Sequence, residues 1–260
     1  MSPSGTSNRA VVVSVGRFDP GVELSNRPGA PRDTKRLHGC LSRRGFSVEL
    51  HNDLTSEEIY KLFRTESRRP VDSCFLTVLS SHGDQGCVFG ADGKVVLLSK
   101  IFGFFDNETM EDKTKVFLIQ ACQGEAMDDG VQTDSNTFSS FSQHLSVPVD
   151  SAVMYAAVPG YAAFMNPTGS FFLQTFCDLL EDHAHMELTR LMTRLSQRVA
   201  LRFSARGRFS GKKQMPCLTT RLTREVFPFA APRKVGGDTG VTATALVSSE
   251  RERSRTRSIS

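Results

Sequence analysis

Four runs of apolar residues, many of them β-branched or aromatic, limit the folds open to this chain of 260 residues. The runs are residues 9–16 (RAVVVSVG), 72–80 (DSCFLTVLS), 114–122 (TKVFLIQAC) and 151–158 (SAVMYAAV). Continuous runs of this length are typical of strands that are buried on both faces of a sheet. Because segments with helical spacing separate them, we predict an α/β fold with a mainly parallel sheet and helices on both faces.

Shorter signals complete the predicted element order. Thr55 and Glu58 have the spacing of a capping box ahead of Ile59, which predicts the start of a helix. Asp92-Gly93 predicts the turn of a hairpin within residues 87–98. We also predict a strand at 46–50, helices at 33–44, 99–107, 170–180 and 187–203, and a last strand at 212–220 near a sheet edge.

Two chemically active side chains follow neighbouring buried strands. His82 comes directly after the strand at 72–80, and Cys122 ends the strand at 114–122. Ligands of parallel sheets bind at the carboxyl ends of the strands, so both residues are expected at the same edge. Cys122 is then either a nucleophile activated by His82 or a small hydrophobic residue at a strand end. As a nucleophile, it would have the N–H groups of Gly83 and Cys122 itself available to bind an oxyanion.

The residues around these two positions resemble the caspase family of cysteine proteases. QACQG at 120–124 is similar to the caspase cysteine motif, and LSSHGDQGCVFG at 79–90 is similar to the segment around the catalytic histidine. NDLTSEEI, GSFFLQTFCDLL and KKQMPCLTTRLT are similar to executioner-caspase sequence, and the resemblance covers about residues 10–229. It implies a caspase-type three-layer sandwich with a six-stranded sheet, in which Cys122 is the nucleophile and His82 the acid/base.

The resemblance also implies a substrate pocket for aspartate made by two arginines and a glutamine. Arg27 in SNRPGA and Gln120 match the first arginine and the glutamine. The second arginine falls on Met165, after Phe164, which would line a neighbouring apolar subsite. Leaving a desolvated charge unmatched costs about 2–5 kcal/mol, or roughly 30- to 5000-fold in binding. We therefore expect a weakened or altered preference for aspartate, unless another basic residue substitutes.

The resemblance further implies a division of the chain into regions. Residues 1–9 would be a short disordered segment, 10–134 the large subunit, 135–229 the small subunit with a linker at 135–148, and 230–260 a disordered Ser/Arg-rich tail. Asp134 is the expected processing site, with Asp128 and Asp129 as weaker choices and an ordinary acidic loop as the alternative. With nine residues before the first strand, we expect no recruitment domain unless a longer native segment precedes them, which favours a zymogen cut by an upstream protease.

Composition excludes several other classes of protein. The tail after residue 230 has six basic and three acidic residues and so supplies +3 of the net charge of +4, which makes nucleic-acid binding by the folded part unlikely. The tail itself could serve RNA binding, nuclear import or phosphorylation. There is no run of 18–20 apolar residues, no secretory signal and no C-x-x-C pair, so we expect a cytoplasmic protein with possible nuclear access. His183 and His185 lack further ligands, so neither a metal site nor a cofactor is expected.

The sequence thus predicts a caspase-like cysteine endopeptidase of apoptosis-type signalling. Its expected partners are protein substrates, an upstream activating protease and a second copy that pairs through the strand at residues 215–220. One alternative is a catalytically weak homologue that forms a heterodimer with an active caspase and regulates it. Another is a peptidase with relaxed specificity for the residue before the cleaved bond.

Overall fold

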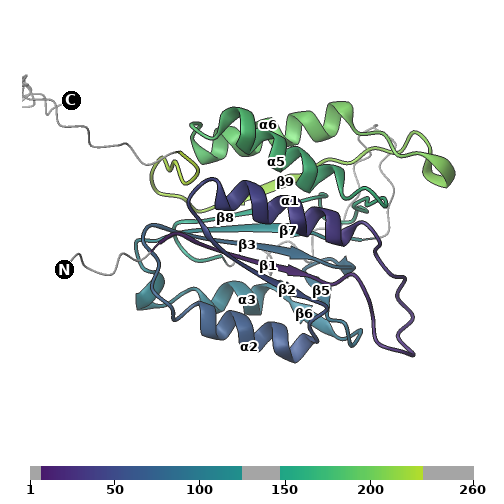
Figure 1. Ribbon diagram of the computed structural model, residues 1–260, viewed down its shortest axis with the longest axis horizontal. Coiled ribbons are helices and arrows are strands. Elements are labelled where there is room, and N and C mark those ends of the chain that lie inside the picture. Colours follow the sequence, from purple (N-terminus) through teal and green to yellow (C-terminus); the bar gives the residue numbers. More distant parts are fainter. Residues whose placement is uncertain (1–6, 125–146, 231–260) are drawn as a thin grey trace, which may run out of the picture.

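The computed structural model describes residues 7–124 and 147–230, and its centre is one six-stranded sheet (Figure 1). The strands lie in the order β2-β1-β3-β7-β8-β9. Their bounds are Ser47–Asn52 for β2, Arg9–Ser14 for β1, Cys74–Ser80 for β3, Thr114–Gln120 for β7, Ser151–Tyr155 for β8 and Cys217–Thr220 for β9. All neighbouring pairs are parallel except β8 with β9, which confirms the mainly parallel sheet.

Helices cover both faces of this sheet, as predicted (Figure 1). One layer holds α1 (Ala30–Ser42), α5 (Phe171–His183) and α6 (Leu188–Arg202), and the other holds α2 (Ser56–Glu66) and α3 (Leu98–Phe104). The sheet has a hydrophobic core on each face, and successive strand residues contribute to the two cores in turn. Val12 and Leu118 face the first helix layer, and Val11 and Phe117 face the second. This alternation is the two-residue period of a strand, and it makes each strand continuously apolar.

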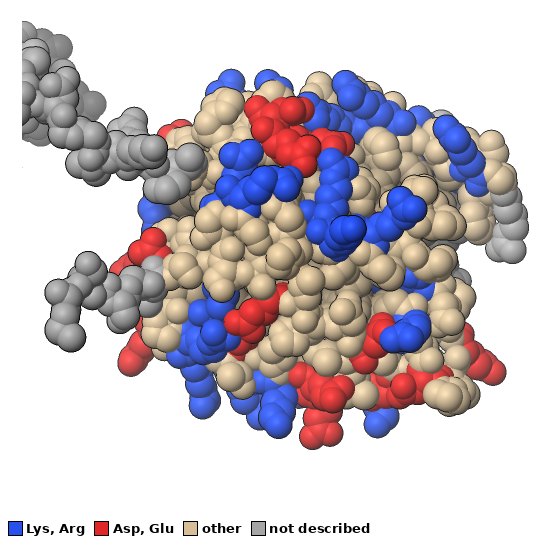
Figure 2. Space-filling view, in the orientation of Figure 1, with Lys and Arg blue, Asp and Glu red and all other residues tan. Residues whose placement is uncertain are grey.

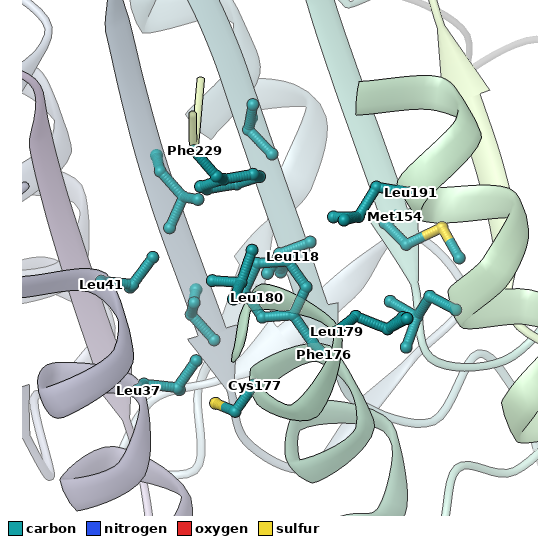
Figure 3. Close-up of a cluster of buried hydrophobic side chains, with 14 of the residues drawn as sticks. Leu37, Leu41, Leu118, Met154, Phe176, Cys177, Leu179, Leu180, Leu191 and Phe229 are labelled. Atoms are coloured by element: carbon teal, nitrogen blue, oxygen red, sulfur yellow. The ribbon is translucent and has the colours of Figure 1, made fainter. Parts of the chain in front are cut away.

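The larger core is formed by residues from distant parts of the chain. Figure 3 shows Leu37 and Leu41 of α1 facing Phe176 and Leu180 of α5 above the strand residue Leu118. Leu191 of α6 and Phe229 near the end of the described chain complete this cluster, and all of these side chains are buried. The core therefore joins segments from both sides of residues 125–146.

A small second sheet follows the third strand. It has β4 (Gly83–Asp84), β5 (Cys87–Phe89) and β6 (Val95–Leu97), paired antiparallel in that order. The predicted hairpin turn is confirmed, since Gly93 adopts a φ of 70° between β5 and β6. The predicted capping box of α2 is also confirmed, because the Thr55 and Glu58 side chains each accept the other's backbone N–H.

Several predicted element boundaries are wrong by a few residues. The helix expected at 33–44 begins at Ala30, because Pro31 is compatible with its first turn. The strand expected at 114–122 ends at Gln120, and the last strand begins only at Cys217. The helix expected at 99–107 ends at Phe104 and is followed by a 3-10 turn, η1 (Glu108–Met110), while a second such turn, η2 (Gly207–Phe209), follows α6. None of the described helices is long and apolar enough to cross a membrane.

Candidate active site

Cys122 lies two residues beyond β7, at the carboxyl end of the parallel strands, and its side chain is half-buried. The backbone of Ala163 contacts the thiol from the loop after β8. The Ala163 N–H donates to Cys122 Sγ at 3.4 Å, and the thiol lies 3.6 Å from the Ala163 carbonyl oxygen. The thiol is therefore held by a backbone segment that neighbours Phe164 and Met165.

His82 lies at the corresponding position after β3. Its Nε2 is 2.7 Å from the Ser25 carbonyl oxygen, and its ring stacks on Phe18 with 5.4 Å between the ring centroids. Burial lowers the pKa of His82, and the positive charge of Arg27 lowers it further against the opposing hydrogen bond to Ser25. The imidazole thus favours its neutral form, which is the form that accepts a proton.

The two segments that contain His82 and Cys122 meet at Gly83. A Cβ atom at residue 83 would lie 2.9 Å from the Ala121 Cβ and 3.3 Å from the Cys122 carbonyl oxygen. Only glycine therefore lets the chain after β3 approach the chain after β7 so closely. Within the described residues, no hydrogen bond joins the Cys122 thiol to the His82 ring, because each side chain is bound to backbone atoms elsewhere.

Arg27 spans the gap between the carboxyl ends of β1 and β3, where the strand order reverses. Its guanidinium donates to the Val15 carbonyl oxygen at 2.7 Å and to Ser80 Oγ at 2.9 Å. Burial lowers the pKa of Arg27 to about 10, although the neighbouring Asp33 and Cys122 oppose this shift. Arg27 is thus a buried cation near the thiol with hydrogen-bond donors left over for a ligand.

Gln120 lies beside Arg27, because Ser80, which Arg27 contacts, pairs with Gln120 in the β3–β7 register. Its side-chain oxygen is buried and has no hydrogen-bond partner in the described part of the chain. A buried amide oxygen without a donor costs free energy unless a donor group satisfies it. Arg27 and Gln120 therefore both lie next to Ser80, and the pocket that the resemblance implies for them stays a prediction.

The loop between β8 and α5 brings Phe164 and Met165 to the same end of the sheet. The Phe164 N–H donates to Gln214 Oε1 at 3.0 Å, and the Phe164 ring stacks against Phe203. Met165 lies against the Arg27 loop, since its Cγ would be 3.0 Å from a Cβ atom at Gly29. Met165 therefore borders the segment that contains Arg27.

Two cavities flank this centre. One, of about 720 Å³, is lined by Arg27 together with Arg17, Lys35 and Asp53. The other, of about 640 Å³, is lined by Phe164 and Met165 together with Arg202 and Arg206. Neither includes Cys122, His82 or Gln120 in its lining. Arg202 and Arg206 are basic residues from outside the loop that share a cavity with Met165, and the sequence provided no means of placing them there.

The sequence analysis did not identify Asp33, which binds the end of the loop between β8 and α5. Both of its carboxylate oxygens accept the Ser170 N–H, at 2.9 and 3.1 Å, and Oδ1 accepts Gln174 Nε2 at 2.6 Å. Burial raises the pKa of Asp33, against the opposing effects of these donors and of Arg27. An acidic residue in the first turn of α1 gave no signal of this role, because its partners lie 137 and 141 positions away.

An α/β sandwich with a partly exposed thiol, an imidazole and a buried guanidinium at one end of its parallel strands has the parts of a cysteine-type endopeptidase. Comparison with known proteins identifies the family. The family model described as the caspase domain matches residues 7–227. The chain belongs to the caspase family and is a caspase-like cysteine endopeptidase.

Individual relatives agree with this assignment. Caspase-3 of Mesocricetus auratus is 34% identical over 228 residues, which cover 84% of this chain and 82% of that protein. Caspase-7 of Gallus gallus is 32% identical over 235 residues, covering 84% of this chain and 76% of the relative. The crystal structure of caspase-1 from Spodoptera frugiperda superposes with a TM-score of 0.74 at 29% identity, covering 86% of this chain and 92% of that structure.

Proposed function

We propose that this endopeptidase is a zymogen that is cut after Asp134 and then cleaves protein substrates after aspartate. Cys122 is the nucleophile, and His82 is the acid/base. The observation that supports these roles best is the close approach of Gly83 to Cys122, which brings the His82 segment to the thiol at the ends of adjacent strands. Asp134 and the weaker candidates Asp128 and Asp129 lie outside the described residues.

The proposed reaction is acyl transfer through a thioester. Neutral His82 first takes the proton of the Cys122 thiol. The thiolate attacks the carbonyl carbon of the peptide bond, and the N–H groups of Gly83 and Cys122 bind the resulting oxyanion. Protonated His82 gives its proton to the leaving amine, and the C–N bond breaks. Neutral His82 then takes a proton from water as that water attacks the thioester carbonyl carbon. The C–S bond breaks, which frees the Cys122 thiolate and releases the substrate fragment with its new carboxyl group. For this reaction the thiol must leave its present contacts with Ala163.

Arg27 and Gln120 are the proposed ligands of the aspartate carboxylate. Arg27 has free donors in a buried position. Gln120 would bind the carboxylate through its Nε2 donors, because its buried Oε1, which has no partner in the described residues, is an acceptor. Met165 supplies no charge where the family places a second arginine, which predicts weaker selection of aspartate. Phe164, packed on Phe203, is proposed to line the adjacent apolar subsite.

The proposed assembly is a pair of cleaved units that meet along β9. This strand is the last of the sheet and contacts only β8 among the described strands, so its other edge is open to pairing. An upstream protease in the cytoplasm would make the first cut, and apoptosis-type signalling is the proposed setting.

A substrate library with all residues at the position before the cleaved bond tests this proposal. The protein is cut after Asp134 and assayed beside Cys122→Ala. Aspartate-selective cleavage that the Cys122→Ala variant lacks would support the proposal, and cleavage that persists in that variant would contradict the role of Cys122. If the unmodified protein cleaves nothing, the result would favour a regulator that pairs with an active caspase. Two observations also favour a regulator: methionine at position 165, where the family has arginine, and the contact of Ala163 with the Cys122 thiol.

The role of Met165 has its own test. Met165→Arg should raise kcat/KM for aspartate substrates by roughly 30-fold or more, because it restores a charge worth about 2–5 kcal/mol. Thr193→Arg, at an exposed position of α6, adds the same charge away from the pocket and should change little. If Met165→Arg leaves kcat/KM for aspartate substrates unchanged, the positive charge that binds the aspartate carboxylate lies elsewhere. Arg202 and Arg206, which line a cavity with Met165, would then be the next residues to replace.

A further inference from the structure

Two cysteines outside the active site lie side by side between helices. Cys40 of α1 and Cys177 of α5 have their sulfur atoms 3.3 Å apart, and each residue is only 1% exposed. Figure 3 shows Cys177 at the edge of the core near Leu37. The chain between the two cysteines includes residues 125–146 and therefore the proposed processing site at Asp134.

Polar contacts hold the two helices in register on either side of the cysteine pair. Arg36 donates to Gln174 Oε1 at 2.8 Å and also binds Asp178, while Arg43 donates to Glu181 Oε1 at 3.0 Å. Figure 2 shows the resulting mixture of acidic and basic side chains on the upper part of this face. Because these contacts lie before and after Cys40 along α1, they keep the two sulfurs facing each other.

We propose that Cys40 and Cys177 are a site of thiol oxidation, at which hydrogen peroxide forms a disulfide that joins the two parts of the chain. The Cys40–Cys177 pair would then keep the amino-terminal and carboxy-terminal fragments covalently linked after a cut within residues 125–146. This proposal is independent of the catalytic roles of Cys122 and His82.

The chemistry balances with peroxide as the oxidant. The Cys40 thiol loses its proton, the thiolate attacks one peroxide oxygen, and the O–O bond breaks. Sulfenic acid forms, and the departing hydroxide takes up that proton to give water. The Cys177 sulfur then attacks the Cys40 sulfur and displaces the hydroxyl as a second water, so two thiols and one peroxide give one disulfide and two waters. The bond needs the sulfurs to close from 3.3 Å to about 2.05 Å, which is a small side-chain movement.

The surroundings of Cys40 favour it as the first thiol to react. The hydrogen bond with Cys177 lowers the pKa of Cys40, and the positive charges of Arg43 and Arg36 act in the same direction, against the opposing effects of burial and of the Glu181 carboxylate. Cys74 differs, because burial alone raises its pKa to about 12. Cys74 therefore serves as the matched control, a buried cysteine without a partner sulfur in the described residues.

The test uses the full chain with residues 130–135 replaced by the recognition sequence of an unrelated site-specific protease. The protein is treated with hydrogen peroxide, its remaining thiols are blocked, and it is cut with that protease. Gels run without reductant should show one band at the full mass, near 28.7 kDa, and gels run with reductant should show two fragments. Cys40→Ala and Cys177→Ala should give two fragments on both gels, whereas Cys74→Ala should behave like the parent.

Peptide mapping by mass spectrometry gives a second readout that needs no variant. A peptide pair containing Cys40 and Cys177 and lighter by two hydrogens is the expected product. Separate fragments without reductant, or a link that persists in Cys40→Ala, would overturn the proposal. Because an added protease makes the cut, a negative result here is distinct from a failure of processing at Asp134 or of catalysis.

Discussion

At the scale of single residues, the environment of His82, the proposed acid/base, is expected to set the pH range of catalysis. The ring is packed on Phe18, and its Nε2 contacts the Ser25 carbonyl oxygen. Burial is the largest influence on its pKa and lowers it, and Arg27 adds to this effect. A lowered pKa keeps the imidazole neutral to a lower pH than a solvent-exposed histidine would be.

We therefore expect the acid limb of the kcat/KM profile to have its midpoint below about 6.5, the ordinary pKa of histidine. Activity should be retained above the lowered pKa of His82 and lost as the pH falls through it. Phe18→Ala should move the midpoint upward, because it exposes the ring and reduces the effect of burial. A midpoint above that of free histidine, or a Phe18→Ala profile identical to the parent, would show that another group controls this limb.

The surroundings of Arg27 bear on the expected effect of Met165. Arg27 already binds Val15 and Ser80 and has Asp33 as a nearby negative charge. A substrate carboxylate would therefore enter a pocket in which one positive charge is already opposed by a negative one. A second arginine would add a positive charge to this pocket, whereas the uncharged Met165 side chain does not.

At the scale of elements, Asp33 joins α1 to the amino-terminal end of α5. Its carboxylate binds the Ser170 N–H and the Gln174 side chain, and it is 2% exposed. Ser170 ends the loop that contains Ala163, Phe164 and Met165. Asp33 is thus a positioning residue for the loop that meets the thiol.

Asp33→Ala should lower the free energy of unfolding by about 1–3 kcal/mol, since it leaves a buried N–H without an acceptor. Thr55→Ala removes a helix cap of α2 and should cost about 1 kcal/mol, so it serves as a control for lost stability alone. Urea unfolding and peptidase assays at 25 °C compare the two variants. We expect Asp33→Ala to lose much more activity than Thr55→Ala, and equal activities would contradict a positioning role.

At the scale of the whole molecule, residues near the end of the described chain complete the larger core. The fully buried Phe229 ring lies 5.8 Å from the Phe46 ring, which precedes β2, and 5.8 Å from the Phe176 ring of α5. These contacts join the amino-terminal strands to the carboxy-terminal helices. The two regions on either side of residues 125–146 therefore share one core.

Phe229→Ala should reduce the free energy of unfolding by about 3–5 kcal/mol, the usual cost of removing a buried aromatic ring. Phe227→Ala, at a position that is 50% exposed, should change it by less than about 0.5 kcal/mol. Deleting residues 231–260 should leave stability close to that of the full chain, because the sequence of this segment is polar and Ser/Arg-rich. Denaturant unfolding measures all three, and a Phe229→Ala variant as stable as Phe227→Ala would contradict this account of the core.

Much of the fold and part of the site follow from local sequence patterns. The period of two residues in the strands and the spacing of the helices determine the mainly parallel sheet, and strand ends bring His82 and Cys122 to one edge. The boundaries of α1, β7 and β9 were predicted less well, because turns and packing decide where a strand or helix ends. The regional division at Asp134 stays a prediction.

The tertiary structure alone decided the contacts between residues that are far apart in the chain. It places Ala163 against the Cys122 thiol, Asp33 beneath the loop at Ser170, and Cys40 beside Cys177. No local pattern encodes these pairs, since each depends on how separate helices and loops pack on the sheet. The sequence by itself determined the family and the candidate nucleophile, whereas packing decided which groups hold that nucleophile and which thiols can meet.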